Sequence, residues 1–135
     1  GIEPKAAFLS HSNFGSTQTA SANKVREATA MFIERYPDIE ADGEMHADAA
    51  LDEKVRMDLL PNTRLTGTAN LLICPNLDSA NISRNLLKIL GGGVTVGPVL
   101  LGLNQEAHVA MASNSPRGIS ELAAVAMANV NRSER

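Results

Sequence analysis

The segment from residue 69 to residue 103 constrains the fold most, because a strand, a helix and a glycine-rich return follow one another without a linker. The apolar run at residues 71–74 stops at Pro75, which is typical of a strand buried on both faces of a mostly parallel sheet. Polar side chains among residues 76–79 then supply oxygens for the free amides that open a helix. The segment therefore predicts an α/β unit that ends at a ligand cleft.

The predicted helix of this segment continues to three consecutive glycines. Ile82, Asn85, Leu86 and Ile89 recur at the spacing of one helix face. Glycines 91–93 end the helix, since glycine adopts positive φ at little cost. Residues 94–96 are expected to begin the next strand, because they are β-branched.

Strands and helices alternate along the rest of the chain as well. Further strands are predicted at residues 6–9 and 39–45, with a short last strand at 108–111. Helices are predicted at residues 21–36 and 47–60 and from about Gly118 onward. The core-facing positions of the first and last helices are Val25, Ala28, Phe32 and Tyr36, and Ile119, Leu122, Ala126 and Val130. This alternation predicts one α/β domain over residues 1–135, a three-layer sandwich around a mostly parallel sheet.

Composition excludes several classes of partner. The net charge is -3 and only 3% of the 135 residues are aromatic, which argues against a nucleic-acid-binding surface. No apolar run approaches the ~20 residues that a membrane-spanning helix needs, so no membrane partner is expected. The one cysteine, Cys74, is expected to be a buried free thiol in the cytoplasm.

Several motifs resemble the phosphate acetyl/butyryl transferase family. They are residues 8–16 (FLSHSNFGS), 42–50 (DGEMHADAA), 69–81 (ANLLICPNLDSAN), 97–103 (GPVLLGL) and 115–118 (SPRG). The resemblance implies the isocitrate/isopropylmalate dehydrogenase-like fold, with this chain as the second lobe of a phosphotransacetylase. In such proteins the register of Gly1 lies well inside the polypeptide, so we expect this chain to be a fragment of a larger protein.

The Ser115-Pro116-Arg117-Gly118 motif is predicted to lie where a loop enters a helix. Free amides, the helix dipole and a guanidinium would then converge on one point, which suits an anion. The resemblance implies that Arg117, with Ser115 and Gly118, contacts an acyl phosphate or the phosphates of coenzyme A. The alternative is an ordinary solvated arginine at a helix start.

This motif departs from the family pattern at two positions. Pro116 stands where active members have serine, and the aspartate implied to act as base on the coenzyme thiol falls on Ala123. A thiol of pKa near ~8.5 is mostly protonated at neutral pH, so loss of its base is expected to slow transfer on the order of 100-fold. The departures therefore predict a catalytically inactive domain.

The turn at residues 11–16 resembles the serine-threonine-lysine-glycine-serine turn of the family, with Asn13 and Phe14 replacing threonine and lysine. A cation is lost, yet hydroxyls and amides of such a turn can hold a phosphate or the pantetheine arm. The predicted ligand contacts of this turn are Ser12, Asn13, Gly15 and Ser16. An ordinary polar turn is the alternative.

These departures resemble the branch of the family that is fused behind malic enzymes. That branch implies a regulatory domain that binds acetyl-CoA and forms homodimers or higher oligomers, with NADP and magnesium or manganese held by an upstream domain in cis. An active phosphate acetyltransferase and a dimerisation module with a vestigial site remain as alternatives.

Two other patterns that could indicate ligand sites have ordinary structural explanations. Asp42, Glu44, His46 and Asp48 would share one face and suit magnesium if the strand continued to residue 48, but the family resemblance explains this block without a metal. Glycines 91–93 lack a following lysine and hydroxyl residue, so they indicate a turn rather than a nucleotide-binding loop. No resident metal is expected.

Overall fold

The computed structural model describes residues 1–105, 107–112 and 114–133. This part of the chain divides into two compact units, Gly1–Arg84 and Asn85–Arg135. The boundary falls within helix α4 (Leu77–Leu90).

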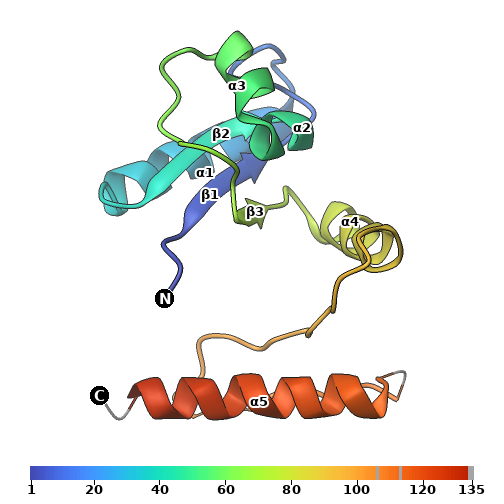
Figure 1. The fold of residues 1–135 in the computed structure, drawn as a ribbon. Helices are drawn as coiled ribbons and strands as arrows, with labels where there is room; N and C mark the ends of the chain where they lie inside the picture. The colour runs from blue at the N-terminus through green and yellow to red at the C-terminus, as the bar shows by residue number, and fades with distance from the viewer. Residues whose placement is uncertain (106, 113, 134–135) are drawn as a thin grey trace. The chain divides into compact units, whose positions relative to one another are not determined.

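Unit 1 is built on a parallel sheet of three strands, β1 (Lys5–Leu9), β2 (Glu40–Met45) and β3 (Leu71–Ile73), in the order β2-β1-β3 (Figure 1). The predicted parallel α/β architecture is confirmed. Strand β1 is therefore the central one: the chain passes from β1 to β2 on one side of it and then from β2 to β3 on the other. In sheets of this kind, ligands bind beyond the carboxyl ends of the strands.

Helix α1 (Ala20–Arg35) covers one face of the sheet, where Val25 packs with Ala6 and Phe8. The helix was predicted correctly, but its buried face differs from the prediction. Thr29 is buried and Ala28 and Tyr36 are exposed. A threonine is accommodated there because its Oγ1 donates to the carbonyl of Val25 at 2.8 Å, so no polar group is left unpaired.

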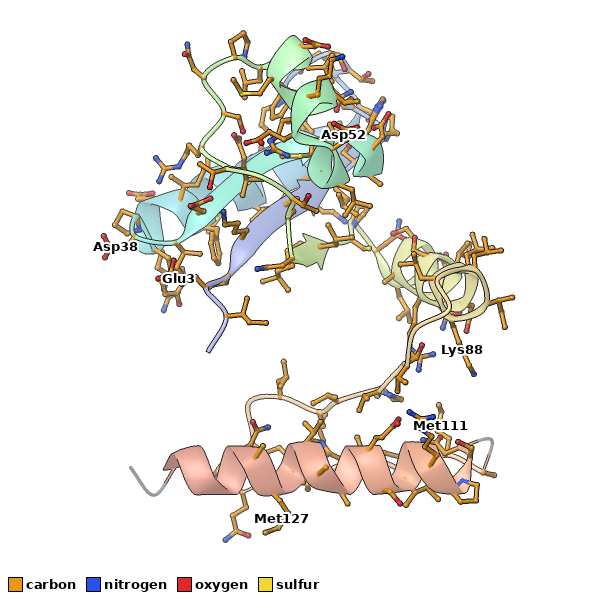
Figure 2. The ribbon with its side chains drawn as sticks, in the orientation of Figure 1. Glu3, Asp38, Asp52, Lys88, Met111 and Met127 are labelled. Atoms are coloured by element: carbon orange, nitrogen blue, oxygen red, sulfur yellow. The ribbon has the colours of Figure 1, made fainter. Side chains whose placement is uncertain are left out.

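The opposite face is covered by two short helices, α2 (Ala47–Leu51) and α3 (Glu53–Leu59), which makes unit 1 a three-layer sandwich (Figure 1). The prediction of one helix over residues 47–60 is wrong. Asp52, at the junction of α2 and α3 (Figure 2), has an extended backbone, and its Oδ1 accepts from the N–H groups of Lys54 and Val55. A strong N-cap in the middle of the segment therefore starts a second helix.

Strand β3 is less buried than predicted. Leu71 is 43% exposed and Ile73 is 36% exposed, because among the described residues β3 pairs only with β1. The strand is nevertheless held in register at its start, where Lys5 N–H donates to Asn70 Oδ1 at 2.8 Å and Asn70 N–H donates to the Lys5 carbonyl at 3.0 Å. The prediction of a strand buried on both faces is wrong for this part of the chain.

Helix α4 begins after Asn76, whose Oδ1 accepts from Ser79 N–H at 2.9 Å, as the sequence predicted. The apolar stripe of α4 is exposed, with Leu86 at 55% and Ile89 at 77%. Residues 94–96 and 108–111, predicted as strands, have no strand structure. A strand needs another strand to pair with, and neither segment belongs to the three-stranded sheet of the described residues.

Helix α5 (Pro116–Ser133) starts two residues earlier than predicted, because proline is favoured at the first position of a helix. Of its predicted face, Leu122 is buried, Ala126 is half-buried and Ile119 is exposed, while the side chain of Val130 lies outside the described residues. Met127 projects from α5 and is 62% exposed (Figure 2). No helix in the described ranges is both long and apolar enough to cross a bilayer.

Candidate functional site

The turn that follows β1 folds around the carboxylate of Glu44, the next-to-last residue of β2. Glu44 Oε1 accepts hydrogen bonds from Ser12 Oγ and from Gly15 N–H, each at 2.8 Å. The Glu44 carbonyl accepts from Phe14 N–H at 2.8 Å. Only 1% of the Glu44 side chain is exposed. A buried negative charge thus lies inside a turn whose hydroxyl and amide donors face inward.

Arg26 of α1 pairs with this carboxylate from the other side. Its Nε donates to Glu44 Oε2 at 3.0 Å and its Nη2 donates to Oε1 at 2.8 Å, a bidentate arrangement. Nη1 donates to Gln18 Oε1 and Asn23 Oδ1, and Nη2 also donates to the Thr17 carbonyl. A guanidinium has five N–H donors, and each one is used here. The pair therefore fixes the turn and the loop that leads into α1.

These contacts stabilise the ionised form of Glu44. Burial alone would raise its pKa, but hydrogen bonds from Arg26, from Gly15 N–H and from Ser12 outweigh burial and lower the pKa from 4.5 to about 2. The hydrogen bond between Arg26 and Glu44 also raises the pKa of Arg26. Glu44 is therefore charged at any physiological pH.

The shifted pKa of Glu44 predicts an acid sensitivity. Because the folded pKa lies below the unfolded value of 4.5, Glu44 contributes stability above that value and loses it as the pH falls toward about 2. The full contribution is on the order of 3 kcal/mol. Urea unfolding followed by circular dichroism should show a steeper loss of stability below about pH 4.5 for the unmodified protein than for Glu44→Gln. Identical pH dependence in the two proteins would contradict this assignment.

Gly43 places the Glu44 carboxylate. A Cβ at Gly43 would lie 2.7 Å from the Phe8 carbonyl oxygen and 2.8 Å from Phe8 Cβ, and the Gly43 φ is +147°. The register of β2 against β1 also shifts here, with Phe8 opposite Gly43 and Leu9 opposite Met45. Glu44 is thus left without a partner residue on β1, and its side chain is directed into the turn.

The structure brings the predicted ligand contacts of the turn together, but the two serine hydroxyls and the N–H groups of Asn13 and Gly15 already have partners within unit 1. Ser12 Oγ and Gly15 N–H bind Glu44, and Asn13 N–H donates to Ser16 Oγ at 3.0 Å. Asn13 Oδ1 accepts from the backbone N–H of His46 at 2.7 Å. The sequence pattern suggested Glu44 only as a metal ligand, and it gave no indication of Arg26. The usable signal was the position of Glu44 at the carboxyl end of a predicted strand.

The acidic residues of the 42–50 block have separate partners. Asp42 Oδ2 accepts from Thr63 Oγ1 and Arg64 N–H, whereas Glu44 binds the turn and Arg26. Strand β2 ends at Met45, so Asp48 lies in α2 and the shared face that the metal interpretation required does not form. Within the described ranges, no group of three or more metal-ligating side chains is found.

The predicted anion site of unit 2 lies at the start of α5. Ser115 Oγ accepts from Gly118 N–H at 3.1 Å, and its carbonyl accepts from Ile119 N–H at 3.0 Å, so Ser115 caps the helix. Arg117 Nε donates to Glu121 Oε1 at 2.7 Å, one turn further along. The Arg117 side chain is 75% exposed, which leaves its other N–H groups accessible.

The two family departures have physical consequences at this helix start. Pro116 has no N–H, and the Gly118 N–H is taken by Ser115, so fewer amides are available to an anion than a helix N-terminus usually offers. Ala123 is exposed on α5 and has no group that can accept a proton. Glu121, the nearest carboxylate in sequence, pairs with Arg117.

Comparisons with known proteins agree with the motifs and the fold. The family model described as "Phosphate acetyl/butaryl transferase" matches residues 1–127. An "NADP-dependent malic enzyme" of Salmonella typhimurium is 51% identical over 128 residues, which are 94% of this chain and 17% of that protein. A "Phosphate acetyltransferase" of Mycoplasma pneumoniae is 42% identical over 103 residues, 75% of this chain and 32% of that protein.

A solved phosphotransacetylase from Streptococcus pyogenes superimposes with a TM-score of 0.89 at 34% sequence identity, covering 97% of this chain and 40% of that chain. This chain thus spans about a sixth of the malic enzyme and less than half of the phosphotransacetylase that it matches. The match of the family model along nearly the whole chain, together with the shared fold, shows that the chain belongs to the phosphate acetyl/butaryl transferase family.

Proposed function

We propose that this chain is an acetyl-CoA-binding regulatory and oligomerisation domain of an NADP-dependent malic enzyme, and that the domain itself does not catalyse acyl transfer. The similarity to the Salmonella malic enzyme supports a malic enzyme as the full-length protein to which this chain belongs. In this full-length protein, malate would be converted to pyruvate and CO2 by an upstream domain in cis that holds NADP and magnesium or manganese. The free thiol of Cys74 fits a cytoplasmic location.

The observation that carries the inactive assignment is the chemistry at the start of α5. Acyl transfer to or from coenzyme A needs a base for the thiol, and Ala123 cannot supply one. Pro116 also removes an amide donor that could stabilise a developing negative charge. Binding of a CoA ester requires neither group, so the site is suited to sensing a ligand rather than transforming it.

Ligand binding is assigned to Arg117 with Ser115 and Gly118, and to the turn that contains Ser12, Asn13, Gly15 and Ser16. Replacing Arg117 with alanine is expected to weaken acetyl-CoA binding about 10-fold, because a charge-assisted contact to a phosphate is lost. Isothermal titration of acetyl-CoA into the full-length protein measures this.

Lys88→Ala is the matched control for that titration. It removes the same charge from an exposed position on α4, and we expect it to leave the affinity unchanged. Equal affinities of Arg117→Ala and the unmodified protein would remove Arg117 from the site. Absence of any acetyl-CoA binding would contradict the proposed function itself.

In the intact enzyme, acetyl-CoA is expected to inhibit malate oxidation.

An active phosphate acetyltransferase is the second candidate, favoured by the similarity to the Mycoplasma phosphate acetyltransferase. It would form acetyl phosphate from acetyl-CoA and inorganic phosphate. Formation of acetyl phosphate by the full-length protein at ordinary turnover, on the order of 1 s⁻¹ or faster, would establish this candidate and overturn the inactive assignment.

Self-association follows from the same proposal. Exposed apolar side chains on α4, among them Leu86 and Ile89, leave a surface that a second copy or another domain would cover. We propose a homodimer or higher homo-oligomer for the full-length protein. Sedimentation equilibrium at micromolar concentration should show it, and a strict monomer would contradict it.

A further inference from the structure

Glu44 is the most deeply buried acidic side chain of unit 1, and the proposed function gives it no role. It is 1% exposed and lies in the turn to which ligand contacts were assigned. An acidic residue is costly to bury unless its charge is paired and hydrogen-bonded. The hydrogen-bond donors around Glu44 provide this pairing.

The donors around Glu44 are of the kind that bind an external anion. A serine hydroxyl, a backbone N–H of a glycine-containing turn and a bidentate guanidinium are the groups that commonly hold phosphate or carboxylate ligands. Here Ser12, Gly15 and Arg26 offer these groups to a carboxylate of the protein itself, at 2.8 to 3.0 Å.

We propose that Glu44 is a resident anion that fills the anion-binding position of the 12–16 turn, so that the turn is preorganised by the protein's own charge and excludes the phosphate of a ligand. Glu44 and Arg26 are then positioning residues. A second negative charge could bind the same donors only by displacing a carboxylate attached to β2.

This inference rests on the proposed function only in what it says about the ligand. If acetyl-CoA binds near the turn, the turn meets an uncharged part of it, such as the amide groups of the pantetheine arm, through exposed atoms like those of Ser16. The phosphates of the ligand are then bound by cations outside the turn.

Truncation of Glu44 provides a direct test. Glu44→Ala removes a CH2–COO⁻ group, which has the size and charge of acetate, and leaves Ser12, Gly15 and Arg26 facing an empty anion position. Hydrogen–deuterium exchange of the full-length protein, read on peptides that cover residues 10–19, should then be about 10- to 100-fold faster. Added acetate is expected to restore most of the protection in a saturable manner, whereas acetamide, which has the same shape without the charge, is not.

Controls separate this effect from general stabilisation by salt. The unmodified protein should gain no protection in the same peptides from acetate or inorganic phosphate, because its site is filled. Glu40→Ala truncates an acidic side chain of the same strand that is bound by Thr66, outside the turn, and should show no acetate-dependent protection at residues 10–19. Phosphate protection of the unmodified turn, or equal rescue by acetate and acetamide, would overturn the proposal.

If Glu44→Ala does not fold, two other measurements still test whether Glu44 fills the anion position. The phosphate measurement on the unmodified protein needs no variant. Glu44→Gln keeps the side-chain volume but presents an amide to Arg26, and it should show the same faster exchange at residues 10–19 as the alanine variant. Exchange equal to that of the unmodified protein would overturn the proposal. Neither readout depends on acetyl-CoA binding, so failure of the proposed function and failure of this inference are distinguishable.

Discussion

Replacing Gly43 with alanine is expected to destabilise unit 1 by about 3–5 kcal/mol, the largest effect of any single methyl group that we anticipate. The added Cβ would lie 2.7 Å from the carbonyl oxygen of Phe8, in the backbone of the central strand, which cannot move without breaking its pairing with β3. The φ of +147° is in addition unfavourable for any residue with a side chain. Exchange protection of the β1 and β2 amides measures the loss.

Gly67→Ala is the matched control for the Gly43 prediction. Gly67 also has a positive φ, +64°, but nothing lies within 4 Å of a Cβ built there. Alanine at this position is expected to cost only about 1 kcal/mol, from the backbone conformation alone. Similar losses for the two substitutions would show that the approach of Phe8 is not the cause, and would contradict the packing argument.

Arg56→Met is expected to cost about 3–5 kcal/mol, because Arg56 is fully buried and binds only backbone carbonyls. Its Nη1 donates to the Ala49 carbonyl at 2.8 Å, and its Nη2 donates to the carbonyls of Gly67 and Leu65. Methionine fills most of the volume but leaves these carbonyls without their donor. The α2–α3 layer and the loop at residues 60–69 should lose exchange protection together.

Arg64→Met provides the comparison for Arg56. Arg64 is exposed, and its guanidinium donates to the Pro37 carbonyl at 3.1 Å, so its loss should change stability by less than about 0.5 kcal/mol. Urea denaturation of the two variants under the same conditions measures the difference. A small effect at both positions would mean that water replaces the Arg56 guanidinium without cost, and the hydrogen-bond argument would be wrong.

Local sequence patterns predicted where most strands and helices of unit 1 lie, but they predicted the burial and pairing of these elements less well. Strand β1 follows from an apolar run, β2 from alternation with acidic residues, and helix α1 from its apolar face and from Pro37 as a stop, which are all local properties of the sequence. The division of the 47–60 segment at Asp52 was missed, although an aspartate before Glu53 is a recognisable N-cap. The exposure of β3 depends on which strands lie beside it, and no local pattern contains that information.

The candidate site shows the same limit more sharply. The motif resemblance suggested the 12–16 turn and Arg117 as ligand contacts, because each lies in a short contiguous motif. The pairing of Glu44 with Arg26 joins residues on different elements, and it depends on the register shift opposite Phe8. A sequence pattern of alternating carboxylates suggested a shared face, whereas Asp42 and Glu44 bind entirely different partners. Contacts between residues far apart in the sequence therefore determine the partners of these carboxylates, and short motifs do not contain that information.

The position of β1 at the centre of the sheet has a consequence for biosynthesis. Among the three strands of unit 1, Lys5–Leu9 leaves the ribosome before the others, because β2 emerges about 35 residues later and β3 only after residue 70. At roughly 5–20 residues per second, β1 is synthesised seconds before the two strands that pair with it in unit 1. Its apolar stretch is only four residues long and is preceded by Lys5, which limits how well it can recruit another nascent chain during that interval.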